Sequence, residues 1–337
     1  MHEAFKSHKF GREFEVGDEI ARGGRGSILG TDERWLLLKK FAPELIVDDP
    51  GRQQVLREKA ERSYQAFCQV NRGRQEELSS LPLEYVTFRG DPAYLMRRAE
   101  GMPLQRILRE RLIESSRRLS LAHALARAFR KLHEAQIIHA DTHPDNYFVR
   151  EDTAGFTVIV LDIDDGGLVS PPGPIYPSVQ PFRLYKAPEL SQMKWEQLFR
   201  RHLFFAPDDW ALAVLVYQLL VDYEGPFCCV KAHPNPAVKN YTPYPAAAYR
   251  DRSVHWPMPW QRQLLQSAGL TDGVVSLFYE TFADRFLLPE KPGGTPRTRD
   301  AAASWEKVLA PQRADRPVQT VYTLKTDRKS TRLNSSH

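Results

Sequence analysis

A short polar loop between two apolar stretches is the feature that most restricts how this chain can fold. The segment Ile138–Val149 holds Asp141 and Asn146 five residues apart, and Asp162 follows Asn146 after sixteen residues, at the end of the apolar run Thr157–Leu161. Each part alone has a plain explanation, because Asp and Asn favour turns and helix caps. Together they suit phosphoryl transfer, in which one carboxylate orients a hydroxyl while an amide oxygen and a second carboxylate hold Mg²⁺.

The first part of the chain, to about Arg98, predicts strands and one helix. Turn residues separate the predicted strands, which are Glu15–Ile20, Gly26–Gly30, Trp35–Phe41, Leu83–Arg89 and Ala93–Met96. Pro50 predicts the start of a polar helix that runs to about Val70, because the N–H that proline lacks is not needed in a first helical turn.

Helices dominate from Pro103 onward. Leu121–Ala135 has apolar residues at helical spacing, and Asp208–Val221 is apolar all round, which predicts a buried helix. Two closing helices, Val274–Phe282 and Ala301–Leu309, follow a Pro-rich stretch of predicted loop at residues 225–260. We therefore predict an α+β, two-lobed fold with a ligand site between the lobes. The predicted parts are residues 1–98, 99–310 and a tail, 311–337.

Composition excludes several classes of protein. No apolar run approaches the ~18 residues of a membrane span, and the first residues lack the apolar core of a secretory signal. The three cysteines form no disulfide framework, so we expect a cytoplasmic location. A net charge of +5 suits an anionic ligand but does not argue for nucleic acid. Residues 327–337 resemble the translation of a sequencing-library adapter, so we expect them to be foreign to the natural protein.

Ordered motifs along the chain resemble the protein kinase superfamily. The polar loop resembles the catalytic loop His-Arg-Asp-Leu-Lys-Pro-Glu-Asn. The other matching segments, in order, are Ile20–Ile28 for the Gly-rich loop, Trp35–Phe41 for the third strand, Tyr94–Leu104 for the hinge, Ala187-Pro188-Glu189 for the end of the activation segment, Asp208–Ala213 for the supporting helix and Arg299–Trp305 for the terminal Arg-to-Trp pattern. The variants are most similar to bacterial kinase-like proteins of the eukaryotic type. The resemblance implies a two-lobed kinase fold with ATP and Mg²⁺ as cofactors.

The resemblance also implies roles for the polar residues. Asp141 would be the catalytic base, Asn146 and Asp162 the Mg²⁺ ligands, and Asp164 an auxiliary ligand. Backbone amides of the Gly-rich loop would approach the nucleotide phosphates where a side chain would block contact. The positions assigned to that loop are Ala21, Gly23, Gly24, Gly26 and Ile28.

The phosphate-binding lysine is assigned by strand alternation and family spacing. Lys39 and Lys40 point to opposite faces of a strand, and the family pattern selects Lys39. A glutamate of the predicted helix should pair with it, and Glu58 fits the family interval better than Glu61. Main-chain groups at Met96–Arg98 should hold the adenine edge.

Five positions depart from the family pattern. Ala21 replaces a glycine, and Leu37 stands where a smaller residue is usual. Ala140 replaces the Arg of His-Arg-Asp, and Asp164 replaces the Gly of Asp-Phe-Gly. His143 replaces the lysine that contacts the γ-phosphate, a role that it can fill when protonated. None of these changes removes the base, the strand lysine or a principal metal ligand, so an active enzyme is favoured.

Three functions remain open. The first is an ATP- and Mg²⁺-dependent Ser/Thr protein kinase, whose partner would be a protein substrate. The second is a small-molecule phosphotransferase of the aminoglycoside or choline kinase type, and the third is a catalytically dead scaffold. Ala187-Pro188-Glu189 and Trp210 favour the first, because protein kinases use this region to bind a peptide. The family pattern also implies a buried pair between Glu189 and Arg299, with Arg297 as the alternative, and Ser170, Ser178 and Tyr185 are candidate phosphorylated hydroxyls of residues 167–186.

Overall fold

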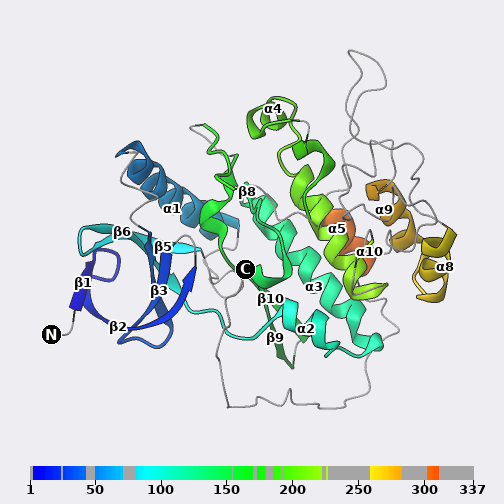
Figure 1. Ribbon diagram of the computed structural model, residues 1–337, viewed down its shortest axis with the longest axis horizontal. Helices are drawn as coiled ribbons and strands as arrows, with labels where there is room; N and C mark the ends of the chain where they lie inside the picture. The colour runs from blue at the N-terminus through cyan, green and yellow to red at the C-terminus, as the bar shows by residue number, and fades with distance from the viewer. Residues whose placement is uncertain are drawn as a thin grey trace, which may run out of the picture.

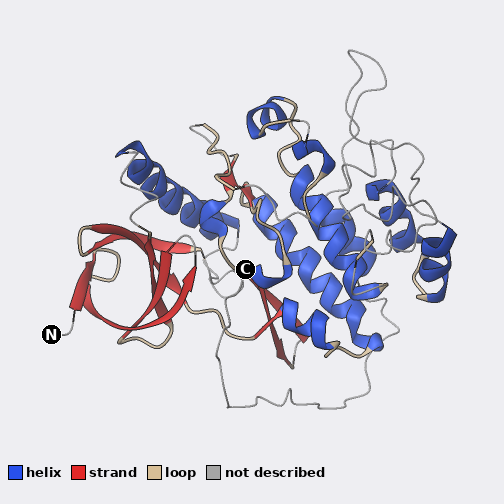
Figure 2. Ribbon diagram, viewed as in Figure 1, coloured by secondary structure: helices blue, strands red, loops and turns tan. Residues whose placement is uncertain are grey.

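The chain folds into a strand-rich lobe followed by a helical lobe (Figure 1). The computed structural model describes residues 3–23, 26–42, 50–70, 81–153, 155–169, 173–179, 185–191, 193–221, 225–226, 259–282 and 302–310. Figure 2 separates the strands, which gather in the first lobe, from the helices, which build most of the second. The predicted α+β, two-lobed fold is confirmed.

One six-stranded antiparallel sheet forms the first lobe. Its spatial order is β1-β2-β3-β4-β6-β5. The strands are β1 (Glu3–Ser7), β2 (Arg12–Gly23), β3 (Gly26–Thr31), β4 (Leu36–Phe41), β5 (Pro82–Phe88) and β6 (Asp91–Arg97). On central strand β4, Leu36 and Leu38 lie in the core of the lobe, and Lys39 and Phe41 are buried on the other face. The sheet ends at Arg97, close to the predicted lobe boundary.

Helix α1 (Pro50–Val70) has the bounds predicted from the sequence. It packs against the sheet through Leu56 and Ala60, which meet Phe41 and Tyr94. The hydroxyl of Tyr94 donates a hydrogen bond to the Leu56 carbonyl at 2.7 Å. These contacts attach the helix to β4 and β6, the strands that lead into the site.

The helical lobe is built around α3 and α5. Its helices are α2 (Leu104–Glu110), α3 (Ser115–Glu134), α4 (Trp195–Arg200), α5 (Ala206–Leu220), α8 (Pro259–Ser267), α9 (Asp272–Phe282) and α10 (Ala302–Leu309). Every residue of α5 is buried, as its all-round apolarity predicts. On α3 the buried residues follow the helical spacing seen in the sequence, and the helix packs against α5 and α10. Helix α3 begins at Ser115, earlier than the predicted start at Leu121. The prediction started too late because the first turn, Ser-Ser-Arg-Arg, has no apolar residue and so shows no helical period.

Short elements packed on the helical lobe carry the polar loop. Two small sheets have the orders β10-β9-β7 and β11-β8. Their strands are β7 (Met102–Pro103), β8 (Ile137–Ile138), β9 (Tyr147–Asp152), β10 (Gly155–Val160) and β11 (Gly167–Leu168). The one-turn helices are η2 (Pro144–Asn146), η3 (Ile163–Asp165) and η4 (Pro188–Ser191). The polar loop therefore lies between β8 and β9, and Asp162 follows β10.

Several predictions fall outside the described residues: those on Gly24, Ser170, Arg297, Arg299, most of the Pro-rich stretch and the tail. In the part of the chain that the structure describes, no helix combines the length and apolarity that a membrane crossing needs.

Candidate active site

A buried carboxylate on α5 binds the backbone of the polar loop. Asp208 Oδ2 accepts the backbone N–H of His139 at 2.7 Å, and Oδ1 accepts that of Ala140 at 2.9 Å. Burial alone would raise the pKa of the Asp208 carboxyl, but His133, His139 and the Ala140 amide hold it below its ordinary value. Asp208 is therefore an anion that shapes the loop. Ala140 there has a left-handed backbone, with φ of 67°.

Asp141 projects from this shaped loop before η2, and Asn146 is the last residue of η2. Asn146 Nδ2 donates to the Asp141 carbonyl at 2.7 Å, which leaves its Oδ1 as an acceptor for a ligand. The Asp141 side chain is 28% exposed, so its carboxylate can reach an acceptor hydroxyl. The loop thus presents a carboxylate and an amide oxygen within one turn of chain, as the sequence predicts.

His143 adds a positive charge to the same loop. Its Nε2 lies 3.8 Å from Asp141 Oδ2, and its Nδ1 lies 3.7 Å from Asp145 Oδ2. Burial works to lower the pKa of His143, but the two carboxylates outweigh it and raise the pKa to about 9. A pKa of about 9 makes His143 a cation at neutral pH, at the position where the resembling catalytic loop has a lysine.

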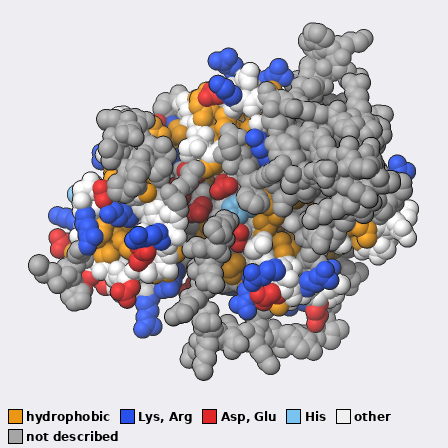
Figure 3. Space-filling model, viewed as in Figure 1, with side chains coloured by type: hydrophobic (Ala, Val, Ile, Leu, Met, Phe, Trp, Pro, Cys, Tyr) orange, Lys and Arg blue, Asp and Glu red, His pale blue; other side chains and the backbone are white. Residues whose placement is uncertain are grey.

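The segment with Asp162 is tied to the loop by backbone contacts. The N–H of Leu161 donates to the Asn146 carbonyl at 2.8 Å, and His139 Nε2 lies 2.9 Å from the Leu161 carbonyl. Asp162 itself adopts a left-handed backbone, with φ of 53°. Its side chain is 49% exposed, so the carboxylate faces the space between the lobes. Figure 3 shows acidic side chains and a histidine gathered near the centre of this face, where the lobes meet.

A close backbone contact sets the position of η3. Gly166 passes so near the Ile138 carbonyl that an added Cβ would lie 2.0 Å from its oxygen. The requirement for a small residue, which the family resemblance places at Asp164, therefore falls on Gly166. Asp165 accepts a hydrogen bond from the Ser178 hydroxyl at 2.8 Å.

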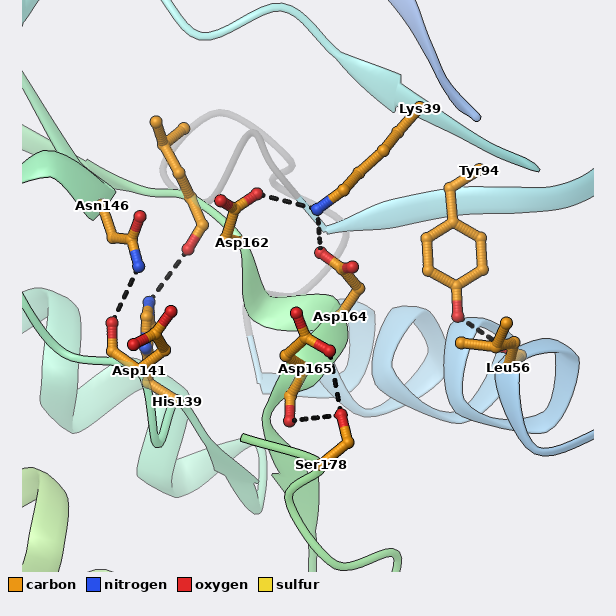
Figure 4. Close-up of polar contacts among 11 residues, drawn as sticks. Lys39, Leu56, Tyr94, His139, Asp141, Asn146, Asp162, Asp164, Asp165 and Ser178 are labelled. Atoms are coloured by element: carbon orange, nitrogen blue, oxygen red, sulfur yellow. Dashed lines mark hydrogen bonds and ion pairs between the residues drawn. The ribbon is translucent and has the colours of Figure 1, made fainter. Parts of the chain in front are cut away.

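Lys39 reaches the aspartates from the other lobe (Figure 4). Its Nζ lies 2.9 Å from Asp162 Oδ1 and 2.8 Å from Asp164 Oδ1. Burial alone would lower the pKa of Lys39, but Asp164 and Asp162 raise it above its ordinary value. Lys40 points the other way and pairs with Asp91 at 2.7 Å. The predicted alternation of the two lysines is confirmed.

The predicted ion pair between Lys39 and Glu58 is replaced by other contacts. Glu58 Oε1 accepts a hydrogen bond from Arg62 at 2.8 Å, and Arg62 also donates to the Gly173 carbonyl at 2.6 Å. Lys39 instead holds Asp162 and Asp164. The expectation failed because a sequence interval fixes the distance along a helix but not which face turns inward. Among the described side chains of α1, the buried polar ones are Lys59 and Ser63.

The Gly-rich segment forms the hairpin between β2 and β3. Ala21 pairs with Ile28 and Gly23 with Gly26, which places this hairpin beside β4 and Lys39. Gly26 has φ of 146°, and a Cβ there would lie 2.0 Å from the Lys40 carbonyl oxygen. This glycine is therefore required by the sheet, whatever it does for phosphates.

Met96 lies where β6 leads into the connection between the lobes. It is buried and pairs with Leu37 of β4. The N–H of Arg98 donates to the Trp35 carbonyl at 2.8 Å. The larger side chain at Leu37 therefore borders the segment assigned to adenine. The binding roles of Met96, Ala21, Gly23, Gly26 and Ile28 stay predictions.

The donor set fits Mg²⁺. Hard divalent cations prefer carboxylate and amide oxygens, and Mg²⁺ usually takes one or two protein oxygens plus phosphate and water. Asp162 and Asn146 offer one such oxygen each on segments that are hydrogen-bonded together. In the described residues no cluster of three or more His, Cys, Asp or Glu side chains suits an all-protein metal cage. Asp164 is only 4% exposed and holds Lys39, which makes it a poorer ligand.

Comparison with known proteins agrees with this geometry. Residues 101–200, which include the loop and Asp162, match the model of the Lipopolysaccharide kinase (Kdo/WaaP) family. The two-lobed architecture, Lys39 on the strand-rich lobe and the polar loop on the helical lobe also follow the order of the kinase-like motifs in the sequence. These matches and the geometry together support the protein kinase superfamily. Within that superfamily, the matched segment is the part that carries the candidate base and metal ligands.

Curated relatives in the superfamily are similar over part of their length. "Ribosomal protein S6 kinase alpha-4" of Mus musculus is 32% identical over 132 residues, which is 37% of this chain and 16% of the relative. "Mitogen-activated protein kinase HOG1" of Ustilaginoidea virens is 26% identical over 144 residues, 41% of this chain and 38% of the relative. The HOG1A kinase of Wallemia ichthyophaga is 25% identical over 161 residues, 48% and 40% respectively. The chain thus spans less than half of each of these kinases.

Two long-range contacts were not predicted from the sequence. Asp164 was expected to assist the metal, and its pairing with Lys39 follows from the one-turn helix η3, which no sequence period announces. The contact between Arg62 and Gly173 joins residues 111 positions apart. A signal for the first existed in the run Asp162-Ile163-Asp164-Asp165, where closely spaced carboxylates call for a cation. The second left no local signal.

Proposed function

We propose that this chain transfers the γ-phosphoryl group of ATP, bound with Mg²⁺, to a hydroxyl group. The observation that carries the proposal is the meeting of Lys39 from one lobe with Asp162 from the other, beside the loop with Asp141 and Asn146. Phosphoryl transfer depends on such positioning and on charge stabilisation more than on covalent chemistry by the protein.

Each residue has a task in this reaction. Lys39 and protonated His143 would bind phosphate oxygens, and Asp162 and Asn146 would hold Mg²⁺. When bound, Mg²⁺ neutralises charge on the phosphates. Asp141 orients the acceptor hydroxyl and takes its proton as the new O–P bond forms. The bond from the γ-phosphorus to the bridging oxygen breaks, and ADP leaves with the electron pair.

The acceptor we favour is a Ser or Thr hydroxyl of a protein. The segment that follows the site, from Leu190 to Leu198, packs on the helical lobe in one apolar cluster with the polar loop. Leu190, Trp195 and Leu198 pack with Ile138 and Ala140 in this cluster. In sequence, this apolar cluster comes directly after Ala187-Pro188-Glu189, in the region that protein kinases use to bind a peptide. The curated relatives named above are protein kinases by their printed names.

A sugar hydroxyl is the second candidate acceptor. The observation that favours it is the match of residues 101–200 to a family described as lipopolysaccharide kinases. Both candidate reactions use the same phosphate-binding residues. They differ only in which hydroxyl group receives the phosphoryl group.

The test is a transfer assay with ATP labelled in the γ-phosphate. The purified chain is incubated with Mg²⁺ and either a generic basic protein or a lipopolysaccharide core saccharide, and Asp141→Asn serves as the inactive control. Label in the protein supports the favoured acceptor, and label in the saccharide supports the second. No transfer to either acceptor, together with no ATP hydrolysis, would favour a catalytically dead scaffold and overturn the proposal.

A further inference from the structure

The partner of Lys39 lies in the lobe opposite to the one that the kinase resemblance predicts. Lys39 Nζ bonds to Asp164 Oδ1 at 2.8 Å, and both side chains are almost wholly buried, with exposed fractions of 8% and 4%. Asp162, the other partner, is half exposed. A buried lysine needs a buried anion, because an uncompensated charge in the interior is strongly destabilising. Asp164 is the anion that meets this need.

Helix α1 does not present a matching carboxylate to the interior. Glu58 is 43% exposed and is engaged by Arg62, one helical turn further on. The same helix buries a lysine, Lys59, and packs against η3, which carries Asp164. The charge on the inward face of α1 is thus opposite to that of a glutamate. A carboxylate for Lys39 has to come from η3.

We infer that Asp164, and not a glutamate of α1, is the positioning residue for Lys39 in phosphoryl transfer. This inference rests on the proposed function and deepens it. Asp164 fixes the direction of the Lys39 ammonium, while Asp162 remains free to turn its exposed carboxylate to Mg²⁺. One aspartate of the pair serves the lysine and the other serves the metal, so the lysine stays aligned when the metal binds.

The geometry of η3 supports this division of tasks. Gly166 is locked against the Ile138 carbonyl, and the N–H of Gly166 donates to the Ile163 carbonyl at 3.0 Å. This closed turn points Asp164 toward β4 and leaves Asp162 at its outer end (Figure 4). A positioning carboxylate on such a turn moves with the catalytic loop. In this arrangement, the alignment of Lys39 does not depend on the position of α1.

The test compares Asp164→Asn with Glu58→Gln in the full chain, with Glu61→Gln as the control for a lost exposed carboxylate on α1. We expect Asp164→Asn to lower kcat/KM for ATP by roughly 10- to 100-fold, the usual cost of losing a group that orients a functional side chain. Glu58→Gln and Glu61→Gln should keep turnover near that of the parent chain. The Mg²⁺ concentration for half-maximal turnover should shift in Asp162→Asn but not in Asp164→Asn.

A second readout does not depend on activity. In thermal unfolding without nucleotide, the stability losses caused by Lys39→Met and Asp164→Asn should be non-additive in the double variant, because both changes remove the same contact. The stability losses caused by Lys39→Met and Glu58→Gln should be additive. Additive losses for Lys39 and Asp164 would contradict the inference. If Asp164→Asn does not fold, Glu58→Gln decides, since the inference requires it to remain active.

The outcomes separate the inference from the proposed function. If the parent chain transfers phosphate and Glu58→Gln abolishes transfer while Asp164→Asn does not, the function stands and the inference is overturned. The contact of Glu58 with Arg62 would then belong to a resting state. If the parent chain transfers no phosphate but the thermal coupling of Lys39 with Asp164 is found, the proposed function fails and the pairing itself stands.

Discussion

The carboxylate of Asp208 accepts the backbone N–H of Ala140, a residue 68 positions earlier in the chain. This contact joins the buried helix α5 to the loop that carries the candidate base. Since the same carboxylate also accepts the N–H of His139, one side chain satisfies two buried donors. The shape of the loop is therefore set by the core of the helical lobe.

Asp208→Ala should destabilise the protein and lower turnover. Each of the two buried donors left without an acceptor costs about 1–3 kcal/mol, so the free energy of unfolding should fall by about 2–6 kcal/mol. Urea denaturation measures the loss, with Asp18→Ala on the exposed face of β2 as the control. Equal stability of the two variants would mean that water replaces the carboxylate and that the loop does not depend on α5.

Lys39→Ala should abolish transfer, and Lys40→Ala should leave most of it. Lys39 is buried against two carboxylates, whereas Lys40 is paired with Asp91 at the surface, where an ion pair is worth ~1 kcal/mol or less. Steady-state rates at saturating ATP provide the comparison. Similar losses in both variants would show that the side of β4 facing the nucleotide has been wrongly assigned.

Asp141→Asn should lower kcat by about 10²–10⁴-fold, the usual contribution of a positioned acid or base. ATP affinity should change little, because Asp141 acts on the hydroxyl and not on the nucleotide. Calorimetric titration with ATP and Mg²⁺ separates binding from turnover. A variant with parental kcat would exclude Asp141 as the base.

Activity should fall as the pH rises through about 9, because His143 then loses its charge. The folded-state pKa of His143 is raised from 6.5, so its stabilising contribution is complete below pH 6.5 and is lost as the pH rises toward 9. The contribution is ~1–3 kcal/mol after allowance for solvent screening. His143→Lys should move the loss of activity to higher pH. A profile that is unchanged in this variant would assign the titration to another group.

Gly166→Ala should destabilise the protein by about 1–3 kcal/mol and impair transfer. The added methyl group would lie 2.0 Å from the Ile138 carbonyl oxygen, so backbone must shift. Gly173→Ala is the matched control, because open space surrounds that position. Melting temperatures and transfer rates of the two variants give the comparison. Tolerance of alanine at Gly166 would mean that η3 adapts without losing its function.

Local features of the sequence predicted much of the fold. Pro50 marked the start of α1, and alternation on β4 separated Lys39 from Lys40. Strand β1 was missed because its five residues, Glu-Ala-Phe-Lys-Ser, hold too few apolar positions to show a period. The contact of Asp164 with Lys39 was missed because it depends on how a one-turn helix is oriented against another lobe. Such long-range orientation has no periodic trace in the chain.

The left-handed backbone of Ala140 and of Asp162 has a consequence for the order in which the molecule comes apart. For an L-residue other than glycine this conformation costs about 1–3 kcal/mol, so local preference opposes the working shape at both positions. The surrounding core must impose that shape, and the two segments are the first to relax when the core loosens. Mild heating or a low urea concentration should therefore abolish phosphoryl transfer while both lobes still keep their secondary structure.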